Sequence, residues 1–264
     1  MTLDERLWKS FNKALGQYQL IDEDDHILVG LSGGKDSLLL TEFLARRQHI
    51  LKPHFTVSAL HVRMEFISPH SDHEAEHVSY ESDTSYLQSF CECLGVPLHI
   101  ITTSFEKDPV PHGSATTSDY SSSGSGSKKP ACFLCSWQRR KQLFNLAQKL
   151  GCTKIALGHH QDDIIHTALM NLIFQGHFST MPAKLRMQKM PLTIIRPLCL
   201  CHEADIQAYA KAHNYEKQLK QCPYEHETKR TTAADLFAYM KQINPEIRYS
   251  IWHALEADEK LTEY

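Results

Sequence analysis

The sequence has no apolar run long enough to cross a membrane, and its first residues, Met1 to Arg6, lack the apolar core of a signal peptide. Its eight cysteines are few and irregularly spaced for a chain of 264 residues, which argues against a secreted disulfide scaffold. We therefore expect reduced thiols, a cytoplasmic location and no membrane partner. The length suits one large α/β domain with insertions.

Acidic residues are almost missing from residues 120–202, where Asp162 and Asp163 are the only two. The same stretch carries eleven basic residues and a net charge of +9, although the whole chain stands at −3. A region of this charge can follow a phosphate backbone, so it favours a nucleic acid partner; a solvated basic surface is the alternative. The candidates for phosphate contact are Lys128, Lys129, Arg139, Arg140, Lys184 and Arg186.

A glycine loop at residues 32–37 follows the apolar run 27–31 and precedes a helical pattern. Glycine lets the backbone approach a ligand closely, and a helix N-terminus offers unpaired N–H groups, so this order predicts a phosphate cradle. Lys35 can neutralise phosphate charge, and Asp36 is placed to hold a magnesium ion. The spacing is neither that of a Walker loop nor that of the dinucleotide motif, and a plain glycine-rich turn is the alternative. The loop consists of Ser32, Gly33, Gly34, Lys35, Asp36 and Ser37.

Hydrophobic patterns of strands and helices alternate along the chain. Strands are expected over residues 27–31, 54–62, 98–102, 154–158 and 194–198, the last being the final strand. Helices are expected over residues 2–19, 78–94, 132–150, 164–174 and 203–213, after the glycine loop and from 231, with a loop at 64–77. This alternation predicts an α/β, Rossmann-like fold with a doubly wound parallel sheet, an N-terminal helix and a C-terminal helical tail.

The chain divides into three expected parts. Residues 1–25 form an amphipathic N-terminal helix, 26–215 form the α/β domain, and 216–264 form a loop with Cys222 and a helical segment. Within the domain, residues 113–129 are rich in serine and glycine and cannot bury themselves, so we expect a mobile insertion there.

Cys132 and Cys135 have the C-x-x-C spacing of a metal-ligand pair, but no second such pair accompanies them. Cys222 lies in a polar stretch and is followed by Pro223, an arrangement common next to iron–sulfur ligands. The remaining cysteines are predicted to be small buried hydrophobic side chains. They are Cys91, Cys93, Cys152, Cys199 and Cys201.

Residues 159–163, His-His-Gln-Asp-Asp, follow the strand predicted at 154–158. Open α/β sheets bind ligands at the carboxyl ends of their strands, so we predict that Asp162 and Asp163 meet a polyphosphate. A charge pair favoured by the helix dipole is the alternative. His159 and His160 either contact a nucleotide or cap the helix, and His61 and Gly158 are further nucleotide-binding candidates.

The glycine loop resembles the PP-loop of ATP pyrophosphatases, whose fold is adenine nucleotide alpha hydrolase-like. With the cysteines, residues 154–163, the pair Arg139 and Arg140, and residues 196–198, the resemblance extends to the tRNA 2-thiocytidine synthetase (TtcA-like) family over residues 20 to 240. In that family the three matching cysteines, here Cys132, Cys135 and Cys222, hold a [4Fe–4S] cluster with one iron left open. The insertion, the loop after the second strand and the single cysteine at 222 depart from the family pattern.

The resemblance implies an ATP- and magnesium-dependent tRNA sulfurtransferase. The C2 carbonyl oxygen of a pyrimidine, cytidine 32, attacks the α phosphate, pyrophosphate leaves into the cradle, and sulfur delivered through the cluster displaces AMP. Catalysis falls to Lys35, Asp36, Cys132 and Cys222. The implied partners are tRNA and a sulfur donor, either a cysteine desulfurase or sulfide, and the sequence leaves a homodimer open.

Two alternatives stand beside this interpretation. A persulfide mechanism without iron would use Cys132 or Cys135 as sulfur carrier and Cys222 as resolving thiol. A non-catalytic, nucleotide-dependent RNA-binding protein would keep the fold alone, although the intact loop with Lys35 and Asp36 argues against it.

Overall fold

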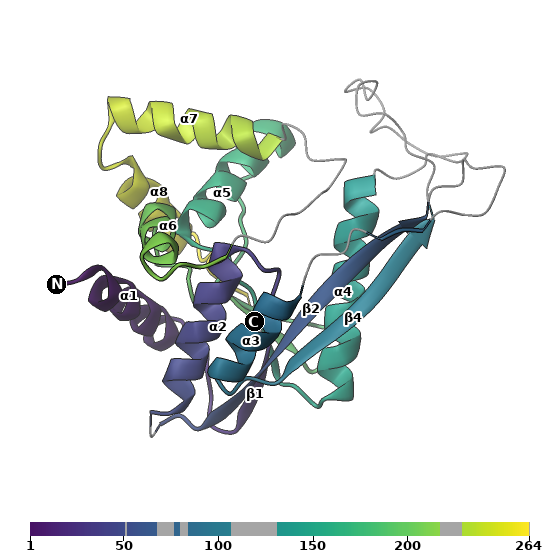
Figure 1. Cartoon of the computed structure of the whole chain (residues 1–264). Helices are drawn as coiled ribbons and strands as arrows, with labels where there is room; N and C mark the ends of the chain where they lie inside the picture. The colour runs from purple at the N-terminus through teal and green to yellow at the C-terminus, as the bar shows by residue number, and fades with distance from the viewer. Residues whose placement is uncertain (51, 68–76, 80–83, 107–130, 217–228, 264) are drawn as a thin grey trace.

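The computed structural model describes residues 1–50, 52–67, 77–79, 84–106, 131–216 and 229–263 (Figure 1). The insertion predicted at 113–129 lies outside the described residues, as do Lys128, Lys129 and Cys222. No helix in the described ranges is long and apolar enough to cross a membrane.

The sheet is built around β1 (Asp25–Gly30), which pairs in parallel with β2 (Phe55–Ile67) on one side and β5 (Lys154–Ala156) on the other. Beyond β2 lies β4 (Leu98–Glu106), and beyond β5 lies β7 (Thr193–Ile195), both again parallel. The mostly parallel α/β sheet was correctly predicted from the sequence.

Three short strands complete the sheet. β3 (His77–Ser79) pairs antiparallel with the end of β2, and β6 (Lys184–Arg186) pairs antiparallel with β7. β8 (Thr262–Glu263) pairs in parallel with β6. The prediction that residues 194–198 form the final strand is therefore wrong. The loop predicted at 64–77 is also wrong in part, because β2 continues to Ile67 with β4 as its partner.

The helices are α1 (Leu3–Gln17), α2 (Lys35–Gln48), α3 (Ser85–Cys93), α4 (Ala131–Lys149), α5 (Gln161–Gln175), α6 (Glu203–Ala212), α7 (Lys229–Ile243) and α8 (Ile247–Ala257). α3 begins seven residues later than predicted, because Val78 belongs to β3. α5 ends as predicted at Gly176, which has a left-handed backbone with φ +70°.

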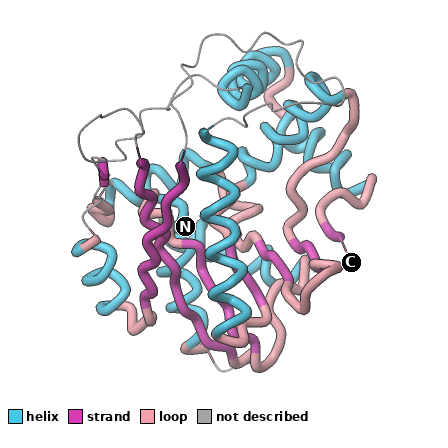
Figure 2. The backbone as a smooth tube through the Cα atoms, turned by 90° about the vertical axis from the view of Figure 1, so that its right-hand side faces the viewer, coloured by secondary structure: helices cyan, strands magenta, loops and turns pink. Residues whose placement is uncertain are grey.

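Helices cover both faces of the sheet, as the alternation along β1 requires. Leu28 points to the face where α4 packs with Leu143 and Leu146. Ile27 and Val29 point to the other face, into the larger core formed with α1, α2, α5, α6 and α8. Figure 2 shows α4 crossing in front of the strands, with other helices behind them.

Candidate functional site

The glycine loop connects β1 to α2 at the carboxyl edge of the sheet. Gly33 has φ +80°, a left-handed conformation that glycine adopts without steric cost, and Gly34 is the N-cap of α2. Ser37 Oγ donates to the Gly34 carbonyl at 2.9 Å and lies 3.2 Å from Ser32 Oγ. Because a glycine N-cap has no side chain to satisfy the first N–H groups of α2, these groups are suited to bind an anion.

Lys35 lies among carboxylates. Its Nζ is 3.2 Å from both carboxylate oxygens of Asp36 and 3.2 Å from Oε1 of Glu203, the first residue of α6. Burial lowers the pKa of the Lys35 ammonium, but the two carboxylates outweigh this effect and raise it above its ordinary value. Lys35 therefore stays charged and is held beside the cradle.

Asp36 carries a buried oxygen, Oδ1, that has the Lys35 ammonium 3.2 Å away but no hydrogen bond in the described chain. Burial raises the pKa of the carboxyl although the Lys35 ammonium opposes it. A buried carboxylate oxygen costs free energy unless a donor or a metal completes it. Asp36 thus fits the magnesium role expected from the sequence.

The loop before α5 lies directly against the first turn of α2. A Cβ atom on Gly158 would come within 3.0 Å of the Asp36 backbone carbon, so a side chain there would push the first turn of α2 away. His160 is the N-cap of α5: its ring accepts from the Asp163 N–H, and Asp163 Oδ2 accepts from the His160 N–H at 3.1 Å. The capping role considered for His160 is thereby confirmed, and its Nε2 is also 3.8 Å from Asp36 Oδ1.

Asp162 is buried and its two oxygens are both engaged. Oδ2 accepts from the Glu203 N–H at 2.9 Å, and Oδ1 accepts from the Arg248 guanidinium of α8. Burial raises the pKa of Asp162, but the bonds from Arg248 and the Glu203 N–H prevail and bring it to about 2. Through these bonds Asp162 connects α5, α6 and α8. Contact of Asp162 with a polyphosphate stays a prediction.

Other predicted residues lie on the neighbouring strand β2 and after β5. His61 is buried in β2, and its Nδ1 lies 2.8 Å from the carbonyl of Leu31. This contact holds the backbone directly before the glycine loop. His159 Nδ1 accepts from Arg196 Nε at 3.2 Å, and Arg196 also donates to the Pro182 carbonyl. Burial lowers the pKa of Arg196 to about 10.

Cys132 and Cys135 are the second and fifth residues of α4. Cys135 is half-buried and packs against Met64 of β2, beyond the carboxyl end of β1. Among the residues that the structure describes, no three His, Cys, Asp or Glu side chains are placed to hold a metal ion. The shared site of Cys132, Cys135 and Cys222 therefore stays a prediction.

Four of the remaining cysteines are buried as predicted. Burial raises the pKa of Cys91 and Cys152 to about 11 and that of Cys201 to about 12, and it raises the pKa of Cys199 as well. These thiols stay protonated and unreactive at neutral pH. The prediction is wrong for Cys93, which is exposed because it follows Cys91 by two positions and so faces away from the core in α3.

The candidate RNA-binding residues that can be placed lie on two separate elements. Arg139 and Arg140 are exposed on α4, whose first turns stand near the ends of β2 and β4 (Figure 1). Lys184 and Arg186 lie on β6, on the other side of β1 in the strand order. Lys184 donates to the Gln19 carbonyl at 2.6 Å, so its ammonium is already engaged.

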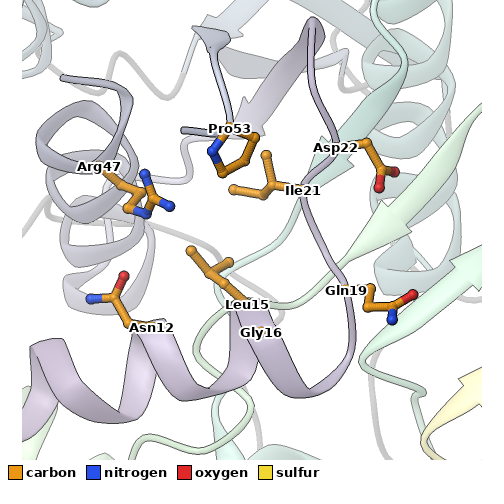
Figure 3. A pocket seen from close by; sticks show the side chains of 8 residues that line it. All are labelled: Asn12, Leu15, Gly16, Gln19, Ile21, Asp22, Arg47 and Pro53. Carbon is orange, nitrogen blue, oxygen red and sulfur yellow. The ribbon is translucent and has the colours of Figure 1, made fainter. Parts of the chain in front are cut away.

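A pocket at the opposite edge of the sheet contains none of the predicted site residues (Figure 3). It lies between the end of α1, the connection to β1, the end of α2 and Pro53. Its lining includes Asn12, Leu15, Gln19, Ile21 and Arg47. Since β1 and β2 begin beside this pocket, it is not the phosphate cradle at their far ends.

Comparison with known proteins decides the family. The PP-loop domain family matches residues 3–218. A tRNA-cytidine(32) 2-sulfurtransferase of Pseudomonas syringae pv. tomato is 33% identical over 99% of this chain and 89% of its own length. The chain belongs to the tRNA-cytidine(32) 2-sulfurtransferase family of PP-loop proteins.

Further relatives agree with this assignment. The family member of Pseudomonas putida is 33% identical over 96% of this chain and 84% of its own length. Among solved structures, the U34-tRNA thiolase NcsA of Methanococcus maripaludis, solved with its [4Fe-4S] cluster, superposes with a TM-score of 0.68. The two chains are 21% identical, and the match covers 97% of this chain and 78% of the thiolase, which shows a shared fold.

Sequence reasoning missed two residues that the structure brings to this site, Glu203 and Arg248. Both come from helices far along the chain and reach Lys35 and Asp162 only through the tertiary fold. No local pattern marks either residue.

Proposed function

We propose that the chain is an ATP-dependent tRNA sulfurtransferase that adenylates the C2 carbonyl oxygen of cytidine 32 and replaces this oxygen with sulfur. The names of its relatives support the substrate, and the PP-loop domain supports the use of ATP. The single observation that carries the proposal is the cradle of Gly33, Gly34 and Ser37 with the buried Oδ1 of Asp36 beside it, an oxygen that accepts no hydrogen bond in the described chain.

Each residue of the loop has a task in the adenylation. The first N–H groups of α2 and the Ser37 hydroxyl bind the β and γ phosphates, and Lys35 neutralises their charge as pyrophosphate leaves. Asp36 would hold a magnesium ion, which supplies further neutralisation of the polyphosphate when bound. Asp163 and His160 keep the loop before α5 next to Asp36.

The sulfur chemistry falls to Cys132, Cys135 and Cys222, which would hold a [4Fe–4S] cluster. When bound, the cluster supplies the sulfur that replaces AMP on the base. Cys132 and Cys135 are one helical turn apart at the start of α4, which suits two ligands of one group. A cysteine desulfurase or sulfide is the proposed donor, and the cytoplasm is the proposed location.

The tRNA is proposed to bind along the basic residues of α4, with Arg139 and Arg140 on its exposed side. A base that reacts must leave its stack, which suits an exposed loop nucleotide. The division into an N-terminal helix, a PP-loop domain and a C-terminal segment from residue 216 is part of the same proposal.

Release of pyrophosphate tests the adenylation. Wild-type protein with ATP and magnesium is expected to release pyrophosphate when unmodified tRNA is added. A tRNA that lacks cytidine 32 is expected to cause no release. No release at all would favour the non-catalytic RNA-binding alternative, and release that is independent of tRNA would contradict adenylation of the base. Iron and acid-labile sulfide in anaerobically purified protein separate the cluster mechanism from the persulfide mechanism.

A further inference from the structure

Arg248 of α8 binds the first two residues of α5, which directly follow the loop of residues 157–160. Its Nη1 donates to Gln161 Oε1 at 3.0 Å, and its Nη2 donates to Asp162 Oδ1. Asp162 is further held through Oδ2 by the Glu203 N–H at the start of α6. Two consecutive residues at the start of α5 are thus fixed by one planar guanidinium, a donor group of rigid geometry.

This loop is in direct contact with the phosphate cradle. Gly158 lies so close to the Asp36 backbone that a Cβ atom would come within 3.0 Å of it, and His160 Nε2 is 3.8 Å from Asp36 Oδ1. Movement of residues 158–162 therefore shifts the first turn of α2, where Lys35 and Asp36 stand.

α8, which carries Arg248, is packed into the hydrophobic core. Ile251, Trp252 and Leu255 are buried in the main core, and the Arg248 guanidinium lies over the Phe237 ring of α7 at 5.2 Å. The Arg248 side chain is 20% exposed. Both helices lie beyond residue 218, where the match to the PP-loop domain ends.

We propose that Arg248 is a positioning residue of the nucleotide site, supplied by the C-terminal helix from outside the PP-loop domain. Through Gln161 and Asp162 it holds the loop before α5 against Asp36. It serves the magnesium and polyphosphate end of the ligand and leaves the adenosine end unaffected. The inference rests on the proposed function only for the use of ATP, and tRNA or sulfur plays no part in it.

Binding of two halves of the substrate tests this role. Affinities for pyrophosphate with magnesium and for AMP are measured by calorimetry, well below the melting temperature of each variant. Arg248→Met is expected to weaken pyrophosphate binding by about 10-fold to 100-fold, the usual cost of losing a partner behind a metal ligand. AMP binding is expected to stay within about twofold, a split that general loosening of the fold does not produce. Arg248→Lys keeps the positive charge but not the planar guanidinium that reaches two acceptors. Its affinity for pyrophosphate is expected to fall between those of wild type and Arg248→Met.

Arg46→Met is the matched control, because Arg46 also pairs with an aspartate, Asp4, and lies over an aromatic ring, Trp8. It is expected to leave both affinities unchanged. Unchanged pyrophosphate binding in a folded Arg248 variant, or an equal loss for AMP, would overturn the proposal. If Arg248→Met does not fold, Arg248→Lys decides by the same split. Absence of thiolation would disprove the proposed function but leave this result standing.

Discussion

Lys35 Nζ lies 3.2 Å from Glu203 Oε1, an ion pair between residues 168 positions apart in the chain. Glu203 is the first residue of α6, and its backbone N–H is already bonded to Asp162. Its carboxylate is paired with the Lys35 ammonium, the group proposed to neutralise the charge of the leaving pyrophosphate. We infer that Glu203 and the phosphates compete for Lys35.

Replacing Glu203 with Gln is expected to tighten ATP binding. The competing charge is lost while the backbone N–H stays, and a half-exposed ion pair of this kind is worth enough to change affinity about two- to fivefold. Titration calorimetry at low salt measures the effect, and added salt should reduce it. Asp205→Asn, two residues along α6, is the control. Weaker ATP binding in Glu203→Gln would show that Glu203 assists Lys35.

Replacing Asp36 with Asn is expected to separate stability from activity. Burial raises the pKa of Asp36, so the ionised carboxylate destabilises the fold at neutral pH, and a neutral amide should raise the melting temperature. Adenylation should fall about 100-fold or more, since an amide holds magnesium poorly. Calorimetric melting and pyrophosphate release are the two measurements. Undiminished turnover would remove the metal role from Asp36.

Asp162 contributes stability that depends on pH. Its pKa is lowered from 3.8 to about 2, so its contribution is present above pH 3.8 and is lost as the pH falls from there toward 2. Asp162→Asn is expected to destabilise the fold by about 2 kcal/mol at pH 7, with the difference shrinking below pH 4. Urea unfolding of both proteins across pH 3 to 7 measures it. A difference that is constant with pH would disprove the ion pair with Arg248 as its origin.

Neutral glutamine variants of Arg139 and Arg140 are expected to weaken tRNA binding. Each lost phosphate contact lowers the slope of log affinity against log salt by about 0.7–0.9, so the double variant should lose about twice that. ATP affinity should be unchanged, because neither side chain belongs to the cradle. Filter binding over a salt series provides the slope, and a parallel fall in ATP affinity would place these arginines in the active site or the fold.

Local patterns predicted the parts of this molecule whose causes are local. The glycine loop, the capping role of His160 and the burial of β1 follow from glycine conformation, helix ends and strand alternation. β6 and β8 were missed because they are short and, unlike the equally short β5 and β7, contain at most one apolar side chain, too few to show a pattern. Glu203 and Arg248 were missed because their partners are distant in sequence, and only the tertiary fold brings them to the site.

The central claim is most directly tested by nucleoside mass spectrometry of unmodified tRNA incubated anaerobically with the protein, ATP, magnesium and sulfide. We predict 2-thiocytidine at position 32 with wild-type protein and with the control Cys152→Ser, whose thiol is buried and has a raised pKa. We predict none with Cys132→Ala, Cys135→Ala or Cys222→Ala, each of which should also lose the iron. Absence of 2-thiocytidine with iron-containing wild-type protein, or full thiolation by Cys222→Ala, would contradict the account.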